Sequence, residues 1–374
     1  MNIFVTSQEL KKAAARLSGC VSDRATSFIG LRSEGACLQL MSTDRILSVH
    51  TNIAAEIEKG GTVFAPGRLL LDLVRELPDA RVNIRLEKSV IVIETQDAGS
   101  FLMRIPVVEN AEWFDRPSIE GSNSLKIEAE RLQYIINQVQ FCISTDSPRA
   151  FGTVGFMHRP EPKKLRLVGT DSFRLSYCDL EIEPSCKFLP QAGISLSKRA
   201  LTEIVNVAKD AQNEIELKLD EEQTALQISS EDCTLLIRLS AVKFPNYQGV
   251  LPTASMNLVK VSKPIIQNAM RRVLLAADKS KALQLSFSNS SLTLTSKTIG
   301  SSEGTESIRL DGYRGADKNL MVNGRFLSEV FSVTNADQLT VQFKSSDEPI
   351  VIAPEQEVAA CKSIHILVPI KETT

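Results

Sequence analysis

The sequence predicts an α+β fold in which one unit, two amphipathic helices packed on antiparallel sheet, occurs three times in 374 residues. Three observations indicate it: a helix pattern that recurs with the same residue types, a strand-to-helix step that recurs with the same spacing, and two passages without periodicity around residues 108–124 and 246–256. A chain of this length suits two or three domains. We therefore expect domains at 1–122, 123–252 and 253–374.

The recurring pattern belongs to the second helix of each domain. Its three copies share an arginine, a leucine, an acidic residue and an aliphatic residue at the same offsets. The aligned segments are Arg68-Leu69-Leu70-Leu71-Asp72-Leu73, Arg199-Ala200-Leu201-Thr202-Glu203-Ile204 and Arg325-Phe326-Leu327-Ser328-Glu329-Val330. Agreement in order, spacing and residue type favours an internal repeat over coincidence.

The first helix of each domain is predicted to follow a strand. The last strand residue and the first core residue of the helix are five positions apart in each copy: Val5 and Leu10, Ile127 and Leu132, Val261 and Ile266. Thr6 and Glu9 have the spacing of a capping box, and Gly19 ends the first helix. Suitable N-caps for later helices are Ser197, Ser262 and Asn323.

The remaining periodic segments alternate apolar and polar residues and are predicted strands. In the first domain they cover residues 37–41, 47–57, 82–94 and 101–107, and a helix over 67–77 ends before Pro78. A Thr-Asp pair follows a strand twice, at Thr43-Asp44 and at Thr170-Asp171. Because a turn aspartate commonly accepts hydrogen bonds from the backbone after it, we interpret both pairs as turns rather than as catalytic groups.

Composition indicates a globular protein without a membrane span. The chain is 43% hydrophobic and 24% charged, lacks an apolar run of about 18 residues, and begins Met1-Asn2-Ile3-Phe4 without a basic leader. We expect a cytoplasmic location. The seven cysteines lack Cys-x-x-Cys spacing, which favours reduced, mostly buried thiols over disulfides or a metal site.

The sequence lacks the common catalytic and cofactor motifs. It contains no Gly-x-x-x-x-Gly-Lys phosphate loop, no Gly-x-Gly-x-x-Gly, no His-Glu-x-x-His and no Gly-x-Ser-x-Gly. The only histidines, His50, His158 and His365, lie one in each predicted domain, which argues against a histidine-centred site. We expect no catalytic residue, no metal and no cofactor, and therefore a scaffold.

Charge is distributed unevenly between the helices and the rest of the chain. The six expected helices (7–18, 67–77, 128–141, 197–209, 262–277 and 324–331) contain 13 Lys and Arg against 7 Asp and Glu, whereas the remainder contains 30 against 38. Basic helices in an acidic protein favour contact with a phosphate backbone without reading of its sequence. Charged helix faces that only contact solvent would give the same count. The charge count therefore supports contact with a phosphate backbone only in combination with the threefold repeat.

Three motifs occur together at positions that one family shares. They are Thr170-Asp171-Ser172-Phe173-Arg174-Leu175, Phe244-Pro245-Asn246-Tyr247 leading to Val250-Leu251-Pro252, and the terminal Val368-Pro369-Ile370-Lys371. With the threefold repeat, they make the whole chain resemble the bacterial β sliding clamp, the processivity subunit of the replicative DNA polymerase. Each motif is weak alone, and the combination is specific.

The resemblance implies a head-to-tail homodimer that closes a ring of six domains, with helices around duplex DNA and sheets outside. Such a ring slides because it is linked topologically to the DNA and makes only weak phosphate contacts. The implied partners are double-stranded DNA, the polymerase catalytic subunit, the clamp loader and repair proteins that carry short clamp-binding motifs. During replication the protein would associate with the nucleoid.

The resemblance also implies a groove for those motifs between the second and third domains. Its expected residues are Thr170, Ser172, Phe173, Arg174, Leu175, Pro245, Val250, Asn323, Phe326, Val368, Pro369, Ile370 and Lys371. Leu175 and Pro245 suit ordinary core or turn roles as well. Two positions depart from the family pattern: Phe173 replaces a common histidine, and Gly249 lacks a basic side chain. The chain also continues as Glu372-Thr373-Thr374, past the usual end.

Further contacts are expected with DNA and at the dimer interface. Expected DNA contacts are Arg24, Arg149 and Phe151 by resemblance, and Lys12, Lys198 and Arg271 from their places on helices. The family closes its ring between first and third domains, which implies an interface that contains Arg68, Arg104, Leu274 and Leu275. Leu274 is equally suited to a helix core.

Two other functions remain open from the sequence. A monomeric repeat adaptor would bind peptides without encircling DNA, and it would not distinguish circular from linear DNA. A hydrolase or transferase would need a catalytic cluster in a cleft between domains.

Overall fold

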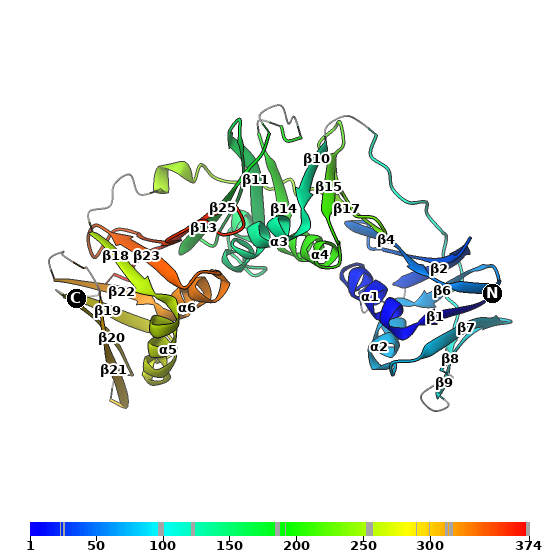
Figure 1. Ribbon diagram of the computed structural model, residues 1–374, viewed down its shortest axis with the longest axis horizontal. Coiled ribbons are helices and arrows are strands. Elements are labelled where there is room, and N and C mark those ends of the chain that lie inside the picture. The colour runs from blue at the N-terminus through cyan, green and yellow to red at the C-terminus, as the bar shows by residue number, and fades with distance from the viewer. Residues whose placement is uncertain are drawn as a thin grey trace. The chain divides into compact units, whose positions relative to one another are not determined.

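The computed structural model describes residues 1–22, 24, 27–95, 101–120, 124–183, 188–190, 192–251, 257–288, 290–298, 300–310, 313 and 317–371. Within these residues the chain forms six α-helices among antiparallel strands. The order strand, helix, several strands, helix, three strands occurs three times. The predicted α+β class and the threefold repeat are therefore confirmed (Figure 1).

The three copies have matching elements. The first contains β1 (Asn2–Thr6), α1 (Ser7–Leu17), β2 (Phe28–Glu34), β3 (Cys37–Thr43), β4 (Leu47–Ala54), β5 (Glu56–Lys59), β6 (Thr62–Pro66), α2 (Gly67–Glu76), β7 (Arg81–Glu87), β8 (Val90–Thr95) and β9 (Phe101–Pro106). The second contains β10 (Ser124–Glu128), α3 (Ala129–Asn137), β11 (Val154–Glu161), β12 (Lys164–Thr170), β13 (Arg174–Glu181), β14 (Ile194–Ser197), α4 (Lys198–Lys209), β15 (Glu214–Leu219), β16 (Ala225–Ser229) and β17 (Cys233–Arg238). The third contains β18 (Asn257–Ser262), α5 (Lys263–Val273), β19 (Ala282–Ser288), β20 (Ser291–Thr298), β21 (Ser302–Arg309), β22 (Lys318–Asn323), α6 (Gly324–Val333), β23 (Gln338–Phe343), β24 (Ile350–Pro354) and β25 (Cys361–Leu367).

Side-chain caps fix the start of two of these helices. Thr6 Oγ1 accepts a hydrogen bond from Glu9 N at 3.2 Å at the start of α1. Asn323 Oδ1 accepts from the backbone N–H groups of Arg325 and Phe326 at 3.0 and 3.2 Å at the start of α6. Each cap satisfies donors that have no partner within the helix. Ser262 is the N-cap residue of α5, as predicted, but its side chain makes no capping hydrogen bond.

Two compact units make up the chain. The first comprises residues 1–133, 186–190 and 199–240, and the second comprises 134–185, 191–198 and 241–374. The first unit contains an eight-stranded sheet in the order β10-β15-β16-β17-β4-β3-β2-β6 and a five-stranded sheet, β5-β1-β7-β8-β9. The second contains β14-β11-β12-β13-β25-β24-β23-β18 and the four-stranded β21-β20-β19-β22.

Each long sheet joins two copies of the repeat at the same place. In the first unit β4 pairs with β17, and Leu47 lies opposite Ile237. In the second unit β13 pairs with β25, and Arg174 lies opposite Leu367. The strand that follows the Thr-Asp turn of one copy therefore meets the final strand of the next copy, and both junctions are continuous antiparallel sheet.

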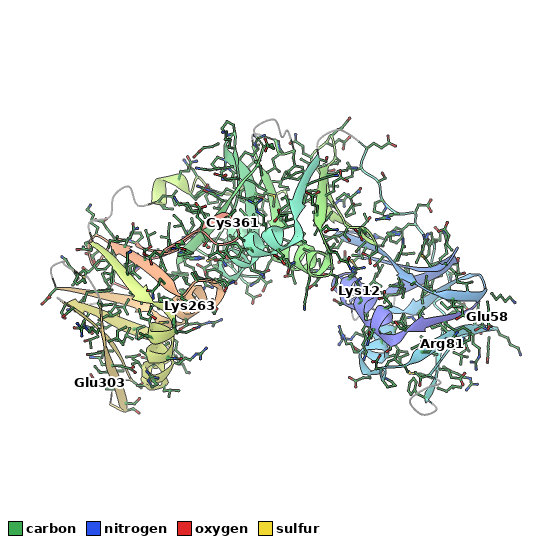
Figure 2. All side chains as sticks on the ribbon, in the orientation of Figure 1. Lys12, Glu58, Arg81, Lys263, Glu303 and Cys361 are labelled. Atoms are coloured by element: carbon green, nitrogen blue, oxygen red, sulfur yellow. The ribbon has the colours of Figure 1, made fainter. Side chains whose placement is uncertain are left out.

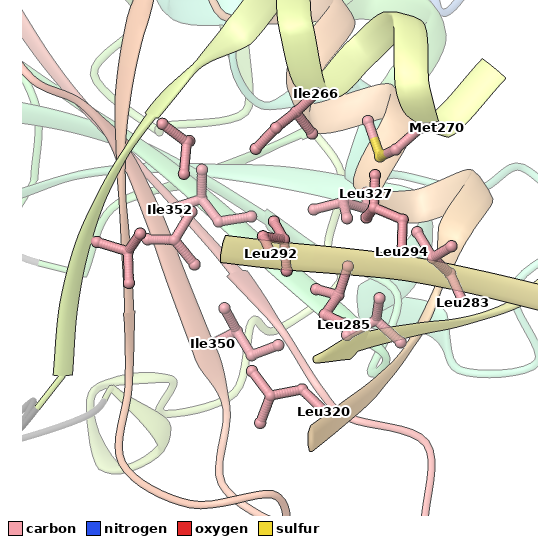
Figure 3. Close-up of a cluster of buried hydrophobic side chains, with 14 of the residues drawn as sticks. Ile266, Met270, Leu283, Leu285, Leu292, Leu294, Leu320, Leu327, Ile350 and Ile352 are labelled. Atoms are coloured by element: carbon pink, nitrogen blue, oxygen red, sulfur yellow. The ribbon is translucent and has the colours of Figure 1, made fainter. Parts of the chain in front are cut away.

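The core of the third copy shows how the helices are held. Ile266 and Met270 of α5 and Leu327 of α6 point toward sheet residues that include Leu285 and Leu294 (Figure 3). All five are almost completely buried. Burial of each such side chain contributes roughly 1.5–3 kcal/mol, so the apolar stripe that the sequence predicts is what fixes each helix on its sheets.

Two predicted strands were wrong in their extent. The segment 82–94 is a hairpin of β7 and β8, in which Lys88 has a φ of 56° and Glu87 lies opposite Val90. The segment 47–57 is likewise divided into β4 and β5. Alternation of apolar and polar residues continues through a tight turn, so periodicity alone does not reveal it.

Other expectations concern linkers, thiols and membrane spans. The described residues 107–120 form no helix or strand, as expected, yet Trp113 contacts the Arg32 guanidinium at 4.1 Å and packs near His50. Of the described cysteines, Cys37 is exposed and the other five are buried. Among the helices of the described part of the chain, none has the length and apolar character to cross a membrane.

Candidate functional site

The turn between β12 and β13 is built from its own side chains. Asp171 Oδ1 accepts hydrogen bonds from the backbone N–H groups of Phe173 and Arg174 at 3.0 and 3.1 Å. Thr170 Oγ1 donates to Arg174 O at 2.7 Å and accepts from Ser172 N at 3.1 Å. Ser172 has a φ of 80°, which turns the chain sharply. Asp171 is therefore a turn residue, as predicted.

The turn between β3 and β4 repeats this geometry. Asp44 Oδ1 accepts from the backbone N–H groups of Ile46 and Leu47 at 2.9 and 2.8 Å. Thr43 Oγ1 donates to Leu47 O at 3.1 Å, and Arg45 has a φ of 75°. The prediction that the two Thr-Asp pairs mark one repeated turn is confirmed. Leu47 occupies the position that Arg174 occupies in the second copy.

Arg174 is buried and makes polar contacts in three directions. Its side chain donates to Asp171 Oδ2 at 3.0 Å, to the carbonyl of Phe141 at 2.7 Å, and to the Glu329 carboxylate. The guanidinium also lies over the Phe326 ring, 4.2 Å from its centroid. Burial alone would raise the pKa of Glu329, but hydrogen bonds from Arg174 and Arg325 hold it below its ordinary value. Arg174 thus joins the turn to α6.

The segment around Tyr247 is anchored on the sheet beside this turn. The Tyr247 hydroxyl lies 2.8 Å from His158 Nε2 and accepts from Arg166 at 3.2 Å. Arg166 in turn forms a two-point pair with Asp179, at 2.5 and 2.7 Å. Burial and the Arg166 charge lower the pKa of His158 to about 4, so His158 is neutral near pH 7. Phe244 stacks on the Phe156 ring with centroids 5.3 Å apart.

A cavity of about 240 Å³ lies between the turn and this anchored segment. Its walls come from β12, β13, β25, the segment after β17, and the segments just before β11 and β24. The lining residues are Arg149, Phe151, Thr170, Ser172, Arg174, Leu175, Pro245, Asn246, Tyr247, Val250, Pro349, Ile366 and Val368. Seven residues expected in the groove are therefore brought together: Thr170, Ser172, Arg174, Leu175, Pro245, Val250 and Val368. We call this cavity the second-unit groove.

An aromatic pair extends the second-unit groove. Phe173 is 64% exposed at the tip of the turn, and its ring centroid lies 6.5 Å from that of Phe326. The backbone carbonyl of Phe173 accepts a hydrogen bond from Val368 N at 3.0 Å. An exposed aromatic ring that is fixed at its backbone offers apolar surface to a ligand at little entropic cost.

Four expected groove residues lie away from the cavity. Ile370 and Lys371 line a different cavity, beside Met321 of β22, and Ile370 N donates to Met321 O at 2.7 Å. Asn323 caps α6, and Pro369 is buried.

The extension Glu372-Thr373-Thr374 lies outside the described residues. A Cβ at Gly249 would meet no atom within 4 Å, so a side chain fits there.

Six residues of the cavity wall were not expected there. Asn246 and Tyr247 belong to the quoted motif, and Arg149 and Phe151 were expected at DNA instead. Ile366 enters through the pairing of β13 with β25, and Pro349, just before β24, enters through the pairing of β24 with β25; neither had a local sequence signal. The Arg149 guanidinium lies 6.0 Å from the centroid of the Phe151 ring.

The other residues expected at DNA differ in their surroundings. Lys12, on α1 (Figure 2), forms an ion pair with Asp232 at 3.3 Å. Lys198 Nζ donates to the carbonyl of Ile143 at 2.6 Å. Arg271 on α5 and Arg24 are exposed. Exposed cations are the ones that can reach a phosphate without losing an existing partner.

The residues expected at the dimer interface lie at the surface, apart from Leu274. Leu275 is 86% exposed just after α5, whereas Leu274 is partly buried against the core of the third copy. Leu274 thus has the core contacts that the sequence left open. Arg104 is exposed on β9, and Arg68 pairs with Asp72 at 2.9 Å on α2.

Comparison with known families covers most of the chain. Sequence models of the DNA polymerase III beta subunit match residues 1–113 as its N-terminal domain, 126–246 as its central domain and 248–367 as its C-terminal domain. The chain belongs to the DNA polymerase III beta subunit family. The order of the three matches is the order of the three copies.

Individual relatives are similar over nearly their whole length. The chain is 23% identical over 363 residues to the beta sliding clamp of Caulobacter vibrioides, covering 94% of this chain and 95% of that protein. It is 23% identical over 381 residues to the beta sliding clamp of Pseudomonas aeruginosa, and the match covers 99% of this chain and 100% of that protein. The solved Bartonella birtlesii sliding clamp bound to griselimycin has the same fold, with a TM-score of 0.87, 22% identity and full coverage of both chains.

Proposed function

We propose that this protein is a non-catalytic DNA sliding clamp. Two chains join head to tail into a ring around duplex DNA, and the ring tethers the polymerase and other proteins by short peptide motifs. The three repeated domains have the boundaries 1–122, 123–252 and 253–374. The protein acts in the cytoplasm, in association with the nucleoid during replication.

The observation that carries the proposal is the pairing rule at the junctions between copies. β4 of the first copy pairs with β17 of the second, and β13 of the second pairs with β25 of the third. In the third copy, β21 has the position that β4 and β13 have in the first two copies. In the first copy, β9 has the position that β17 and β25 have in the other two. Both β9 and β21 end their sheets, with one neighbour each among the described strands.

The same rule applied between two chains pairs β21 of one protomer with β9 of the other. Each chain has one strand of each type, so two chains satisfy both contacts and leave neither β9 nor β21 as an unpaired edge. Arg104 lies on β9, and Leu275 follows the helix that packs on β21. Their exposure supports a place for both at this interface.

The second-unit groove supports the tethering part of the proposal. Its walls combine apolar groups, such as Leu175, Ile366 and Val368, with the fixed polar groups Thr170 and Ser172. Such a cavity can bury apolar anchors of a short peptide while the polar groups set its direction. We assign Phe173 and Phe326 to its aromatic end, because their rings are close to each other.

Two measurements test the proposal. Sedimentation or light scattering should give twice the chain mass of 41.2 kDa at physiological salt, and a stable monomer would contradict the ring. The loaded protein should stay on nicked circular DNA and leave after a single cut. A peptide adaptor without a ring would show no difference between circular and linear DNA. The junction rule disfavours it because β9 and β21 would each remain without the partner that the rule gives them.

A further inference from the structure

The repeated turn creates a second cavity, in the first unit. This cavity, of about 430 Å³, is bounded by the turn after β3 and by strands β4, β16 and β17. Its walls include Arg45, Ile46, Ser48, Ala225, Leu236 and Arg238. We call it the first-unit groove. The proposed function makes no use of it.

The first-unit groove occupies the same place in the repeat as the second-unit groove. Leu47 lies opposite Ile237 in one, and Arg174 lies opposite Leu367 in the other. Arg238 N donates to Ile46 O at 2.8 Å, as Val368 N donates to Phe173 O at 3.0 Å. Four pairs of wall positions match: Arg45 and Ser172, Ser48 and Leu175, Leu236 and Ile366, and Arg238 and Val368. Ile46 matches Phe173, which extends the second-unit groove.

The two grooves differ in charge at two matched positions. Arginine stands at two wall positions of the first-unit groove, where the second-unit groove has Ser172 and Val368. Arg45 and Arg238 are exposed, and within the described part of the chain neither forms an ion pair. Asp44, the nearest turn carboxylate in sequence, is already paired with Arg199. Two cations therefore flank an apolar surface that includes Ile46, which is 51% exposed.

We propose that the first-unit groove binds an acidic peptide segment with apolar side chains, presented by a partner protein. The guanidinium groups of Arg45 and Arg238 would each hold a carboxylate, for which arginine has matching two-point geometry. Apolar side chains between the carboxylates would cover Ile46 and Leu236. A nucleic acid would engage the arginines by phosphate but leave this apolar surface uncovered, so a peptide fits the groove better.

A labelled hexapeptide of alternating glutamate and leucine tests the proposal on the full-length protein. Fluorescence anisotropy should show saturable binding that weakens as salt rises, and a peptide with glutamine in place of glutamate should bind much less. The double variant Arg45→Ser, Arg238→Val installs the residue types of the second-unit groove. Serine is tolerated at a φ near 75°, because Ser172 has a φ of 80°. The affinity of the double variant for the glutamate peptide should be about tenfold or more below that of the parent protein.

Matched controls separate this proposal from the proposed function. Phe173→Ala changes only the second-unit groove and should leave binding of the glutamate peptide unchanged, and neither result depends on ring closure. Thermal melting of each variant, and the single variant Arg238→Gln, guard against misfolding.

Equal binding of the two peptides, unchanged affinity in the double variant, or lost affinity in Phe173→Ala would overturn the proposal. Loss of affinity for a short DNA duplex, without binding of either peptide, would assign the arginines to phosphate instead.

Discussion

The guanidinium of Arg174 forms an ion pair with the carboxylate of Glu329 and so fixes a turn of the second copy to α6 of the third. Arg174 is only 8% exposed, and the Phe326 ring covers one of its faces. A side chain in these surroundings positions the wall of the groove and has few donors left for a ligand. Its contribution to peptide binding is therefore expected to come through the shape of the groove.

Arg174→Ala should lower the free energy of unfolding by about 2–4 kcal/mol, because it leaves the Phe141 carbonyl and part of Glu329 without a partner. Arg325 still pairs with Glu329 at 2.9 Å, which limits the loss. Urea unfolding followed by circular dichroism measures it. The matched control is Arg199→Ala, a more exposed arginine paired with Asp44, for which about 1 kcal/mol or less is expected. Equal losses in both variants would contradict the structural role of Arg174.

Phe173→Ala should weaken binding of a clamp-motif peptide about tenfold and leave stability within about 0.5 kcal/mol of the parent, because the ring is exposed. Ile46→Ala alters the equivalent turn position in the first unit and is the control. Isothermal titration with one peptide compares the three proteins. If Ile46→Ala weakens that peptide as much as Phe173→Ala does, the second-unit groove is not where it binds.

Arg271→Ala should weaken DNA binding and lower the slope of log affinity against log salt by about 1, as expected for one lost phosphate contact. Its neighbour Arg272 is the control, because it already pairs with Glu306 at 2.8 Å. Arg272→Ala should change the slope less. Arg149→Ala, which alters the wall of the second-unit groove, should affect the motif peptide more than DNA.

The fold could be predicted from the sequence because its signals are local. Amphipathic stripes fix α1 and α5 on their sheets, and Thr43-Asp44 and Thr170-Asp171 form turns from atoms within five residues. The groove could be predicted only in part. Pro349 and Ile366 reach it through strand pairing between distant segments, which no local pattern encodes.

The burial of Arg174 was beyond the sequence for a similar reason. Its partners Phe141 and Glu329 are 33 and 155 positions away along the chain. Leu47, at the equivalent position of the first copy, is an apolar core residue. Alignment of the copies therefore identifies the position as unusual without revealing what surrounds it.

Leu275→Asp should convert the dimer to a monomer, because dimer formation would bury the charge of the aspartate between the protomers. The chain itself should stay folded, because Leu275 is 86% exposed in the single chain. Light scattering should report the single-chain mass, with a melting temperature that reflects the isolated chain. Leu274→Asp is the contrasting variant. Leu274 packs against the third-copy core, so this change should destabilise the chain itself by about 2–4 kcal/mol. A Leu275→Asp dimer of unchanged mass would remove Leu275 from the interface.

The ion pair of Asp232 with buried Arg16, at 3.1 Å, should make stability depend on acid pH. Burial raises the pKa of Asp232, but the hydrogen bonds and charges of Arg16 and Lys12 outweigh it and leave the pKa below its ordinary value. A carboxylate with a depressed pKa in the folded state stabilises above the pKa of the unfolded chain, about 3.9, and loses that contribution as pH falls through its folded pKa.

Asp232→Asn should therefore lower the free energy of unfolding by about 1 kcal/mol at pH 7, a value kept small by solvent screening of a partly exposed carboxylate. The difference between variant and parent should stay constant down to about pH 5 and shrink below about pH 4, where the parent loses the charge as well. Urea unfolding at pH 7, 5 and 3.5 measures this. Lys12→Met removes the longer of the two ion pairs, 3.3 Å against 3.1 Å, and should cost less at every pH. A difference that grows on acidification would show that the Arg16 pair does not depress the pKa of Asp232.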